Sequence, residues 1–419
     1  MADTHPDRRR PCYVAAPPMR FRDVRQLLQL EAPERDPVAR RLRRCVDVET
    51  MRALARRRMP RSVFDYADGG ADLEIGLRAN REAFEAARFR PRVLRAVEGC
   101  DPSATLLGER FDLPLLLSPT GYTRMMHPEG EAAVARAARA AELPYGLSTV
   151  SSTSIEDLAA TGHPHLWFQL YLWRDREMAF DLVRRAEAAG YDVLELSVDV
   201  PVSGYRVRDV RNGLTIPPAL KWGTIADISL HPSYWVSMLR SAPIEFANAP
   251  PSIAGGVTIE NMSAQFDPRL GWEDLEEVRR RWPRKLLLKG PISAADAERA
   301  LAAGVDGLHL SNHGGRQLDR TVPTLALLAS VRERVGPEPF VIVDSGIRSG
   351  ADLAIAIARG ADAGGIGRVY LYGLMVGGER GVAHAVSLVR ADFVRTMQLL
   401  GVGSVAELRA RGAELVTPP

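Results

Sequence analysis

Eight short apolar segments alternate with amphipathic segments along most of this chain, and this alternation constrains its fold more than any other feature. Each apolar segment is short and apolar throughout, which is typical of parallel strands covered on both faces. The intervening segments 129–142, 176–189, 293–303 and 349–359 have the spacing of helices that bury one face. The eight predicted strands are 113–117, 145–150, 166–173, 193–200, 285–289, 307–311, 340–344 and 363–367.

One helix-to-strand connection occurs three times. Segments 188–192, 302–306 and 358–362 each place a Gly two residues before an Asp, where a predicted helix gives way to a strand. Gly suits the left-handed residue that follows the last turn of a helix. A repeated connection indicates a repeating strand–helix unit, and eight such units close into a TIM (β/α)8 barrel. A doubly wound open sheet is the alternative, but no G-x-G-x-x-G turn follows the first strand.

Two parts of the chain do not follow this alternation. Residues 1–45 are rich in Arg and Pro, so we predict an N-terminal extension before a barrel domain at 46–419, whose first helix spans 47–59. Residues 201–271, after the fourth strand, contain many prolines without a clean period, and a connection of this length typically has a functional role such as a lid. Its apolar patch 234–239 is predicted to pack or to form a lid, with a docking surface for a partner or membrane as the alternative.

Composition excludes several classes of protein. The net charge of +3 provides no electrostatic basis for binding nucleic acid. The three cysteines have no metal or redox spacing and the eight histidines form no H-E-x-x-H motif, so no metal is expected. No segment approaches the roughly 18 apolar residues of a membrane span, and no apolar core of a secretory signal is present near the N-terminus. We therefore expect a cytoplasmic protein, with peripheral contact at the inner face of the membrane as a further possibility.

Polar residues follow the predicted strands at their carboxyl ends. In a barrel these ends meet on one face, which is where barrel enzymes place their active sites. The segment 311–319 contains His313 and Arg316 with two glycines between them. The ordinary pKa of His, about 6.5, suits proton transfer near neutral pH, and the Arg fork matches a carboxylate. The sequence thus predicts a site that binds an acid and moves a proton.

The other strand ends predict a cofactor. Gly346 with Arg348, and Gly367 with Arg368, follow the last two strands, where barrels commonly bind phosphate. Lys289 ends the fifth strand, and a cation suits a flat heterocycle that gains negative charge, as a flavin does on reduction. The neutral polar residues expected around this ring are Ser148, Gln169 and Ser197.

Taken in order, these motifs resemble those of the FMN-dependent α-hydroxy-acid dehydrogenases and oxidases. The resemblance extends from about residue 47 to about residue 404 and is most marked toward L-lactate dehydrogenases of the bacterial respiratory type, in 344–346 and 370–374. The other matching motifs are 64–66, 69–71, 118–121, 127–131, 168–171, 197–199, 288–290 and 311–319.

This resemblance implies oxidation of a small (S)-2-hydroxy acid, first of all L-lactate to pyruvate, with FMN as cofactor. It implies that His313 is the base and Asp199 its partner, and that Tyr171 binds the reacting oxygen. The substrate carboxylate would be held by Arg206, Arg316 and Tyr66. The expected cofactor contacts are Pro119, Thr120, Gly121, Ser148, Gln169, Ser197, Lys289, Ser311, Asp344, Gly346, Arg348, Gly367 and Arg368.

Departures from the family pattern leave alternatives open. Gly121 stands where many members have Ala, and Val150 where some oxidases have an aromatic residue. The protein could therefore be an oxidase or monooxygenase using O2, or act on a larger substrate that is mandelate-like or peptide-borne. The electron acceptor stays open among quinone, cytochrome and O2, and the family implies a homotetramer. Residues 364–365, both Gly, have no functional account from the sequence.

Overall fold

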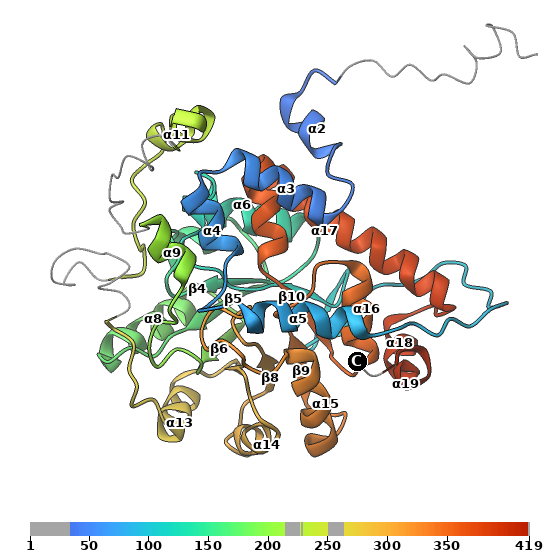
Figure 1. The fold of residues 1–419 in the computed structure, drawn as a ribbon. Helices are drawn as coiled ribbons and strands as arrows, with labels where there is room; N and C mark the ends of the chain where they lie inside the picture. Colours follow the sequence, from blue (N-terminus) through green and yellow to red (C-terminus); the bar gives the residue numbers. More distant parts are fainter. Residues whose placement is uncertain (1–33, 214–226, 228, 250–263, 418–419) are drawn as a thin grey trace, which may run out of the picture.

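The computed structural model describes residues 34–213, 227, 229–249 and 264–417. At its centre is a closed barrel of eight parallel strands, in which β10 pairs with β3 to complete the ring (Figure 1). The predicted barrel is thereby confirmed, and every strand falls within its predicted segment except β7, which runs one residue further, to Gly290. The strands are β3 (Leu115–Leu117), β4 (Tyr145–Ser148), β5 (Leu166–Leu170), β6 (Val193–Ser197), β7 (Lys285–Gly290), β8 (Gly307–Leu310), β9 (Phe340–Val343) and β10 (Ala363–Ile366).

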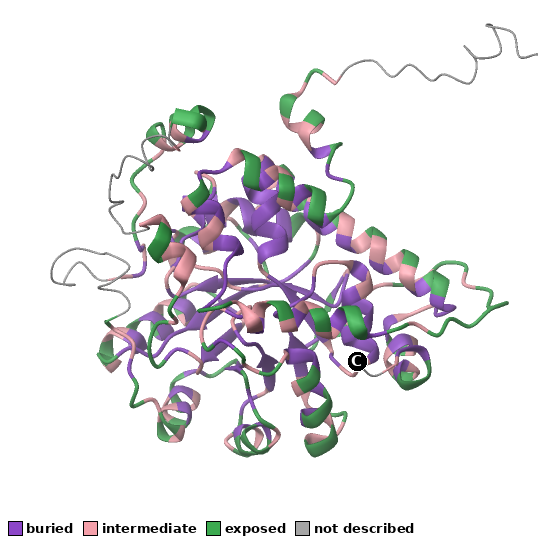
Figure 2. Cartoon of the chain, in the orientation of Figure 1, coloured by how far each residue is buried: buried purple, intermediate pink, exposed green. Residues whose placement is uncertain are grey.

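Helices surround the barrel, with buried inner faces and exposed outer faces (Figures 1 and 2). Ser or Asp side chains accept backbone N–H groups at the start of several of them, as at Ser293 and Ser349. The repeated glycines Gly190, Gly304 and Gly360 have φ angles of +87°, +88° and +103°, which is the left-handed conformation expected after a helix. The surrounding helices are α6 (Gly130–Ala140), α7 (Ile155–Ala159), α8 (Arg176–Ala188), α13 (Trp272–Arg281), α14 (Ala294–Ala302), α15 (Thr324–Val335), α16 (Gly350–Ala358) and α17 (Arg368–Leu400).

The interior of the barrel changes from apolar to polar along the strands. Alternate residues of a strand point to the same side. Near the amino ends, inward residues such as Trp167, Val193 and Leu287 form one cluster with the hairpin of β1 (Ala104–Leu106) and β2 (Glu109–Phe111). Two residues further along those three strands stand Gln169, Glu195 and Lys289, all buried. The barrel thus has an apolar lower half and a polar floor beneath its carboxyl face.

Further helices lie before and after the barrel. From residue 34 onward the predicted extension contains α2, which packs against α17, while residues 1–33 lie outside the described residues. The hydroxyl-rich turn after β3 leads into a short 3-10 helix, η1. The bounds of these elements are α2 (Pro37–Leu42), α3 (Val48–Arg58), α4 (Arg61–Asp68), α5 (Ile75–Ala86), η1 (Thr123–Met125), α18 (Val405–Ala410) and α19 (Gly412–Leu415).

The long connection after β6 contains α9 (Val207–Asn212), which packs against α4, and α11 (Pro232–Leu239), which lies apart from the barrel at the upper left of Figure 1. Tyr234 of α11 is buried and donates its hydroxyl to the carbonyl of Met125 at 2.7 Å. Leu239 is 82% exposed, so only one edge of this patch packs. Parts of the predicted lid, 214–226, 228 and 250–263, lie outside the described residues.

Within the described ranges, no helix combines the length and apolar character needed to cross a membrane.

Candidate active site

A cavity opens at the carboxyl ends of the strands, where the sequence predicted the site. It brings together side chains from the first helices, from most strand ends and from the segment after β6. Four of the predicted residues, Asp199, Gln169, Ser197 and Ser311, lie behind its surface. The predicted residues that line it are Tyr66, Pro119, Thr120, Gly121, Ser148, Tyr171, Arg206, Lys289, His313, Arg316, Asp344, Gly346, Arg348, Gly367 and Arg368.

His313 follows β8 in a left-handed backbone conformation, with φ of +58°. This conformation is uncommon for a residue with a side chain and is retained where the surroundings enforce it. The loop is held because the N–H of His313 donates to Ser311 Oγ at 3.1 Å and that of Gly314 to Ser345 Oγ at 2.9 Å. The backbone therefore fixes where the imidazole points.

The His313 ring is oriented by a buried carboxylate. Its Nδ1 lies 3.1 Å from Asp199 Oδ2, and its Nε2 lies 3.4 Å from the hydroxyl of Tyr171. Burial opposes ionisation of Asp199, but His313 and Lys289 outweigh it and hold the pKa of this carboxyl below its usual value. Because an ionised carboxylate only accepts hydrogen bonds, Nδ1 carries the proton and Nε2 is left as a base. Burial raises the pKa of Tyr171 well above its usual value, so its phenol stays protonated.

Two guanidinium groups lie together beside this imidazole. Arg316 lies over the ring of Tyr66, 5.0 Å from its centroid, and donates to the carbonyls of Tyr66 and Gly69. Arg206 donates to Asp209 Oδ2 at 2.8 Å. Burial lowers the pKa of Arg316, and the positive charge of Arg206 lowers it further. Two like charges held close together at a cavity wall suit a ligand carboxylate between them.

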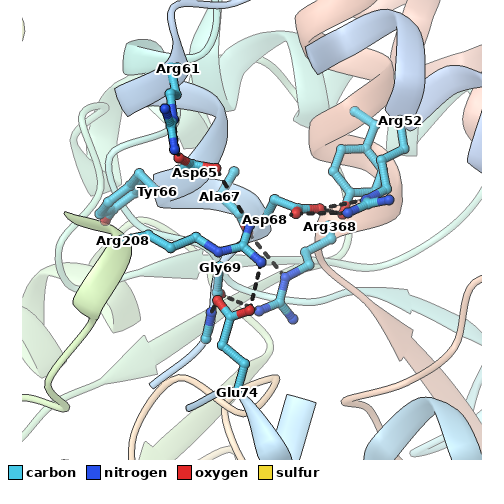
Figure 3. Close-up of polar contacts among 12 residues, drawn as sticks. Arg52, Arg61, Asp65, Tyr66, Ala67, Asp68, Gly69, Glu74, Arg208 and Arg368 are labelled. Carbon is cyan, nitrogen blue, oxygen red and sulfur yellow. Dashed lines mark hydrogen bonds and ion pairs between the residues drawn. The ribbon is translucent and has the colours of Figure 1, made fainter. Parts of the chain in front are cut away.

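A second pair of cations follows β9 and β10. Arg368 begins α17 and is buried, and burial together with the nearby Arg348 lowers the pKa of Arg368 to about 9. Its guanidinium donates to the carbonyls of Ala67 and Gly69, at 3.0 and 2.7 Å (Figure 3). The two arginines thus form a second place in the same cavity where an anion would relieve cationic repulsion.

The carboxyl end of α4 is fixed by a cluster of charges around the buried Asp68 (Figure 3). Asp68 accepts Arg52 Nε at 2.6 Å, Arg208 Nη1 at 3.1 Å and the Tyr372 hydroxyl at 2.8 Å. Arg208 also donates to Glu74 at 2.6 Å. The cluster holds in place the carbonyls that Arg316 and Arg368 use. The sequence did not single out Asp68, because its partners are distant along the chain.

Polar side chains lie at the floor of the cavity and directly behind it. Lys289 Nζ donates to Ser311 Oγ at 2.9 Å and lies 3.8 Å from Asp344 Oδ2. Among the described residues, Gln169 Nε2 and Ser197 Oγ are buried without a hydrogen-bond partner. Buried polar groups normally have partners, so these atoms indicate that a ligand belongs above the floor.

Two aromatic residues of the long connection reach this site, which the sequence did not predict. Phe246 packs on Tyr122 with ring centroids 4.6 Å apart, and Phe266 packs on Tyr171 at 5.3 Å. Both line the cavity. Their segment has no strand or helix period, so no sequence signal pointed to them. They give the cavity an apolar wall in addition to its cations.

The unusual glycines have packing reasons in the structure. A Cβ on Gly121 would lie 2.6 Å from Cγ2 of Val150, so the small residue and the branched one fit each other. A Cβ on Gly364 would lie 2.6 Å from the terminal methyl groups of Ile347 and Leu353. Glycine is therefore closely packed at both positions, and a side chain there would require these neighbours to shift.

Comparisons with known proteins agree with this geometry. A family model described as FMN-dependent dehydrogenase matches residues 55–414. The chain is 46% identical to a putative L-lactate dehydrogenase of Mycobacterium tuberculosis over 395 residues, 94% of each protein. It is 42% identical to (S)-mandelate dehydrogenase of Pseudomonas putida, over 86% of this chain and 92% of that protein. A crystal structure of the monotopic membrane protein (S)-mandelate dehydrogenase superposes with a TM-score of 0.85 at 40% identity, over 89% of this chain and 99% of the other.

Proposed function

The chain belongs to the family of FMN-dependent dehydrogenases, and from this premise we propose that it oxidises a small (S)-2-hydroxy acid, with L-lactate, converted to pyruvate, as the first expected substrate. One observation carries the proposal. The imidazole of His313, oriented by Asp199, lies in the same cavity as the guanidinium groups of Arg206 and Arg316. A proton acceptor beside a carboxylate site is what oxidation of a 2-hydroxy acid needs.

The residues present fit FMN. The unpaired Gln169 Nε2 and Ser197 Oγ can bind the polar edge of a flavin ring, and Lys289 supplies a cation below it. Arg348 and Arg368 suit the phosphate. The further cofactor contacts proposed are Pro119, Thr120, Gly121, Ser148, Ser311, Asp344, Gly346 and Gly367. When bound, FMN supplies the two-electron acceptor of the reaction.

The side chains around the proposed substrate divide the remaining work. Arg206 and Arg316 bind the carboxylate, with Tyr66 beside them, and so fix which face of the 2-carbon meets the floor of the cavity. His313 Nε2 takes one proton from the substrate, and Asp199 stabilises the imidazolium that results. Tyr171, kept protonated by burial, donates a hydrogen bond to the substrate oxygen.

A larger substrate is the second candidate, because the wall formed by Phe246 and Phe266 is aromatic. An aryl group attached to the 2-carbon would pack there.

Anaerobic titration of the FMN-loaded protein with L-lactate, D-lactate and (S)-mandelate tests both candidates through bleaching of the flavin. L-lactate should bleach it and D-lactate should not. Bleaching by (S)-mandelate alone would assign the larger substrate, and bleaching by none of the three acids would overturn the proposal.

We further propose a cytoplasmic tetramer with peripheral contact at the inner face of the membrane, which passes electrons to a quinone or cytochrome. The exposed Leu230, Val236 and Leu239, in and beside α11, support the membrane contact, since α11 lies apart from the barrel. Oxygen is the competing acceptor. Hydrogen peroxide formed in air, compared with dye reduced without air, separates the acceptors, and light scattering gives the number of subunits.

A further inference from the structure

A chain of buried charges runs from Lys289 and Asp344, which the proposed function uses, to His309 and Glu195, which it does not. The side chain of His309, in β8, has no exposed surface and lies between two carboxylates. Its Nδ1 is 2.8 Å from Glu195 Oε1, and its Nε2 is 3.1 Å from Asp344 Oδ2. The same Asp344 oxygen lies 3.8 Å from Lys289 Nζ. Asp344 and Lys289 line the cavity, whereas His309 and Glu195 lie behind them.

Strand β10, which is separated from β8 by β9, makes room for this histidine. A Cβ on Gly365 in β10 would overlap Ser118 Oγ and would lie 2.9 Å from Asp344 Cβ and 3.5 Å from His309 Nε2. Barrel interiors are ordinarily filled by bulky branched side chains. Here Gly365, His309 and Glu195 stand in the barrel interior instead of such side chains. The small glycine leaves space for the buried charged groups.

The hydrogen bonds indicate which form His309 takes. Asp344 accepts the Ser345 hydroxyl at 2.6 Å as well as His309, so it acts as an ionised acceptor. With carboxylate acceptors on both nitrogens, the ring carries a proton on each. Burial lowers the pKa of His309, but Glu195 and Asp344 outweigh it and raise that pKa above the usual value.

The charge balance below the cavity depends on this imidazolium. Two carboxylates, one ammonium and one imidazolium sum to zero within the chain Glu195, His309, Asp344 and Lys289. Without the imidazolium the sum is one negative charge, buried where charges act strongly because the surroundings are poorly polarisable. A flavin gains negative charge when reduced, so an added negative charge below it opposes reduction.

We propose that His309 is a positioning residue whose positive charge, shared between Glu195 and Asp344, keeps the Lys289 side of the cavity cationic and makes the bound flavin easier to reduce. This rests on the proposed function only in requiring that FMN binds above Lys289. It adds to that function a determinant of reduction potential that lies outside the cavity.

The test is the midpoint potential of the bound flavin, measured by slow enzymatic reduction against a reference dye, with no 2-hydroxy acid present. His309→Gln should shift the potential to more negative values, because it removes a positive charge. Glu195→Gln should shift it to more positive values, because it removes a negative one. Opposite signs are the expected result, and loss of packing alone would not produce them.

His163→Gln is the matched control. His163 is also a buried histidine, but it lies before β5, toward the amino ends of the strands, and burial lowers its pKa to about 4, so it is uncharged. Its replacement should leave the potential unchanged.

The proposal is overturned if His309→Gln binds FMN with an unchanged or more positive potential, or if both charge variants shift the same way. If His309→Gln does not fold, the sign of the Glu195→Gln shift decides, and a shift that is absent or negative overturns the proposal. Wild-type protein that binds no FMN would overturn the proposed function as well.

Discussion

At the scale of single residues, the site depends on groups whose positions are fixed before any ligand arrives. His313 is held by its own left-handed backbone and by Asp199, and Arg316 is held by the carbonyls of Tyr66 and Gly69. Preorganised groups of this kind bind without further loss of side-chain freedom. These side chains are already ordered when the protein folds. Substitutions at His313 and Arg316 should therefore affect ligand binding more than the stability of the fold.

Arg316→Lys tests this directly. Lysine keeps the charge but loses the fork that binds a carboxylate with two hydrogen bonds, so we expect KM for L-lactate to rise by about 10- to 100-fold, the equivalent of about 1.5–3 kcal/mol. Stability should fall by only about 1 kcal/mol, through the lost bond to a backbone carbonyl. Steady-state kinetics with an artificial electron acceptor measure the first quantity and urea unfolding the second. An unchanged KM would show that Arg316 does not bind the substrate.

Most of the predicted site residues line the cavity, whereas the sequence did not single out two residues that lie beneath it. Lys289 lies at the end of an apolar strand, and His313, Arg206 and Arg316 follow such strands. The convergence of strand ends in a barrel was therefore enough to bring them together. His309 and Glu195 lie inside strands and were taken as part of the apolar segments. The sequence does show that each of these strands carries a polar residue at a position that can point into the barrel. To predict that the two residues meet, one must know how their strands are aligned in the barrel, and the sequence does not give that alignment for strands that are not consecutive.

At the scale of elements, the strands and helices of the barrel follow from local pattern, while the segment after β6 does not. Predicted strands run past the observed ones at 149–150, 171–173 and 198–200, because the chain continues apolar after it leaves the hydrogen-bonded ladder. Phe246 and Phe266 reach the cavity from a segment without a period, so their place depends on tertiary packing alone.

The site depends strongly on the carboxyl end of α4, because the backbone carbonyls there accept hydrogen bonds from Arg316 and Arg368. Asp68→Asn removes a buried carboxylate that binds Arg52, Arg208 and Tyr372, and we expect a loss of about 2–4 kcal/mol, moderated because both arginines are partly exposed. Urea unfolding at pH 7 measures it. Asp181→Asn, which breaks the exposed pair with Arg184, should cost no more than about 0.5 kcal/mol. Equal losses in the two variants would contradict this account.

The same cluster predicts a direction of pH dependence. Although burial favours the neutral form of Asp68, Arg52 outweighs it and holds the pKa of this carboxyl well below its usual value. A group with a depressed folded pKa contributes stability above its unfolded pKa, about 3.9, and loses that contribution as the pH falls. The difference in unfolding free energy between wild type and Asp68→Asn should therefore shrink below about pH 4.

At the scale of the whole molecule, the proposed active site lies at one face of the barrel, and helix α11 lies apart from the barrel. Figure 2 shows α11 mostly exposed, in contrast to the buried strands. An exposed apolar projection of this kind suits contact with a membrane surface or a protein partner. If it contacts lipid, charge placed on α11 should matter more than charge placed elsewhere.

Cosedimentation with vesicles of bacterial lipid tests this for the FMN-loaded protein. Leu239→Glu should reduce the bound fraction several-fold, because it places a carboxylate on the exposed side of α11. Leu399→Glu is the control, since Leu399 is 70% exposed near the end of α17, on the opposite side of Figure 1. A similar loss in both variants, or none in either, would exclude α11 as the membrane contact.

The most direct test of the whole account is reduction of the bound flavin by L-lactate in His313→Asn, followed anaerobically by stopped flow. Asparagine tolerates the left-handed backbone of this position, so the fold and the bound FMN should be preserved. We predict that bleaching slows by at least about 100-fold relative to wild type, the contribution of a general base. Bleaching at the wild-type rate would contradict the proposed mechanism.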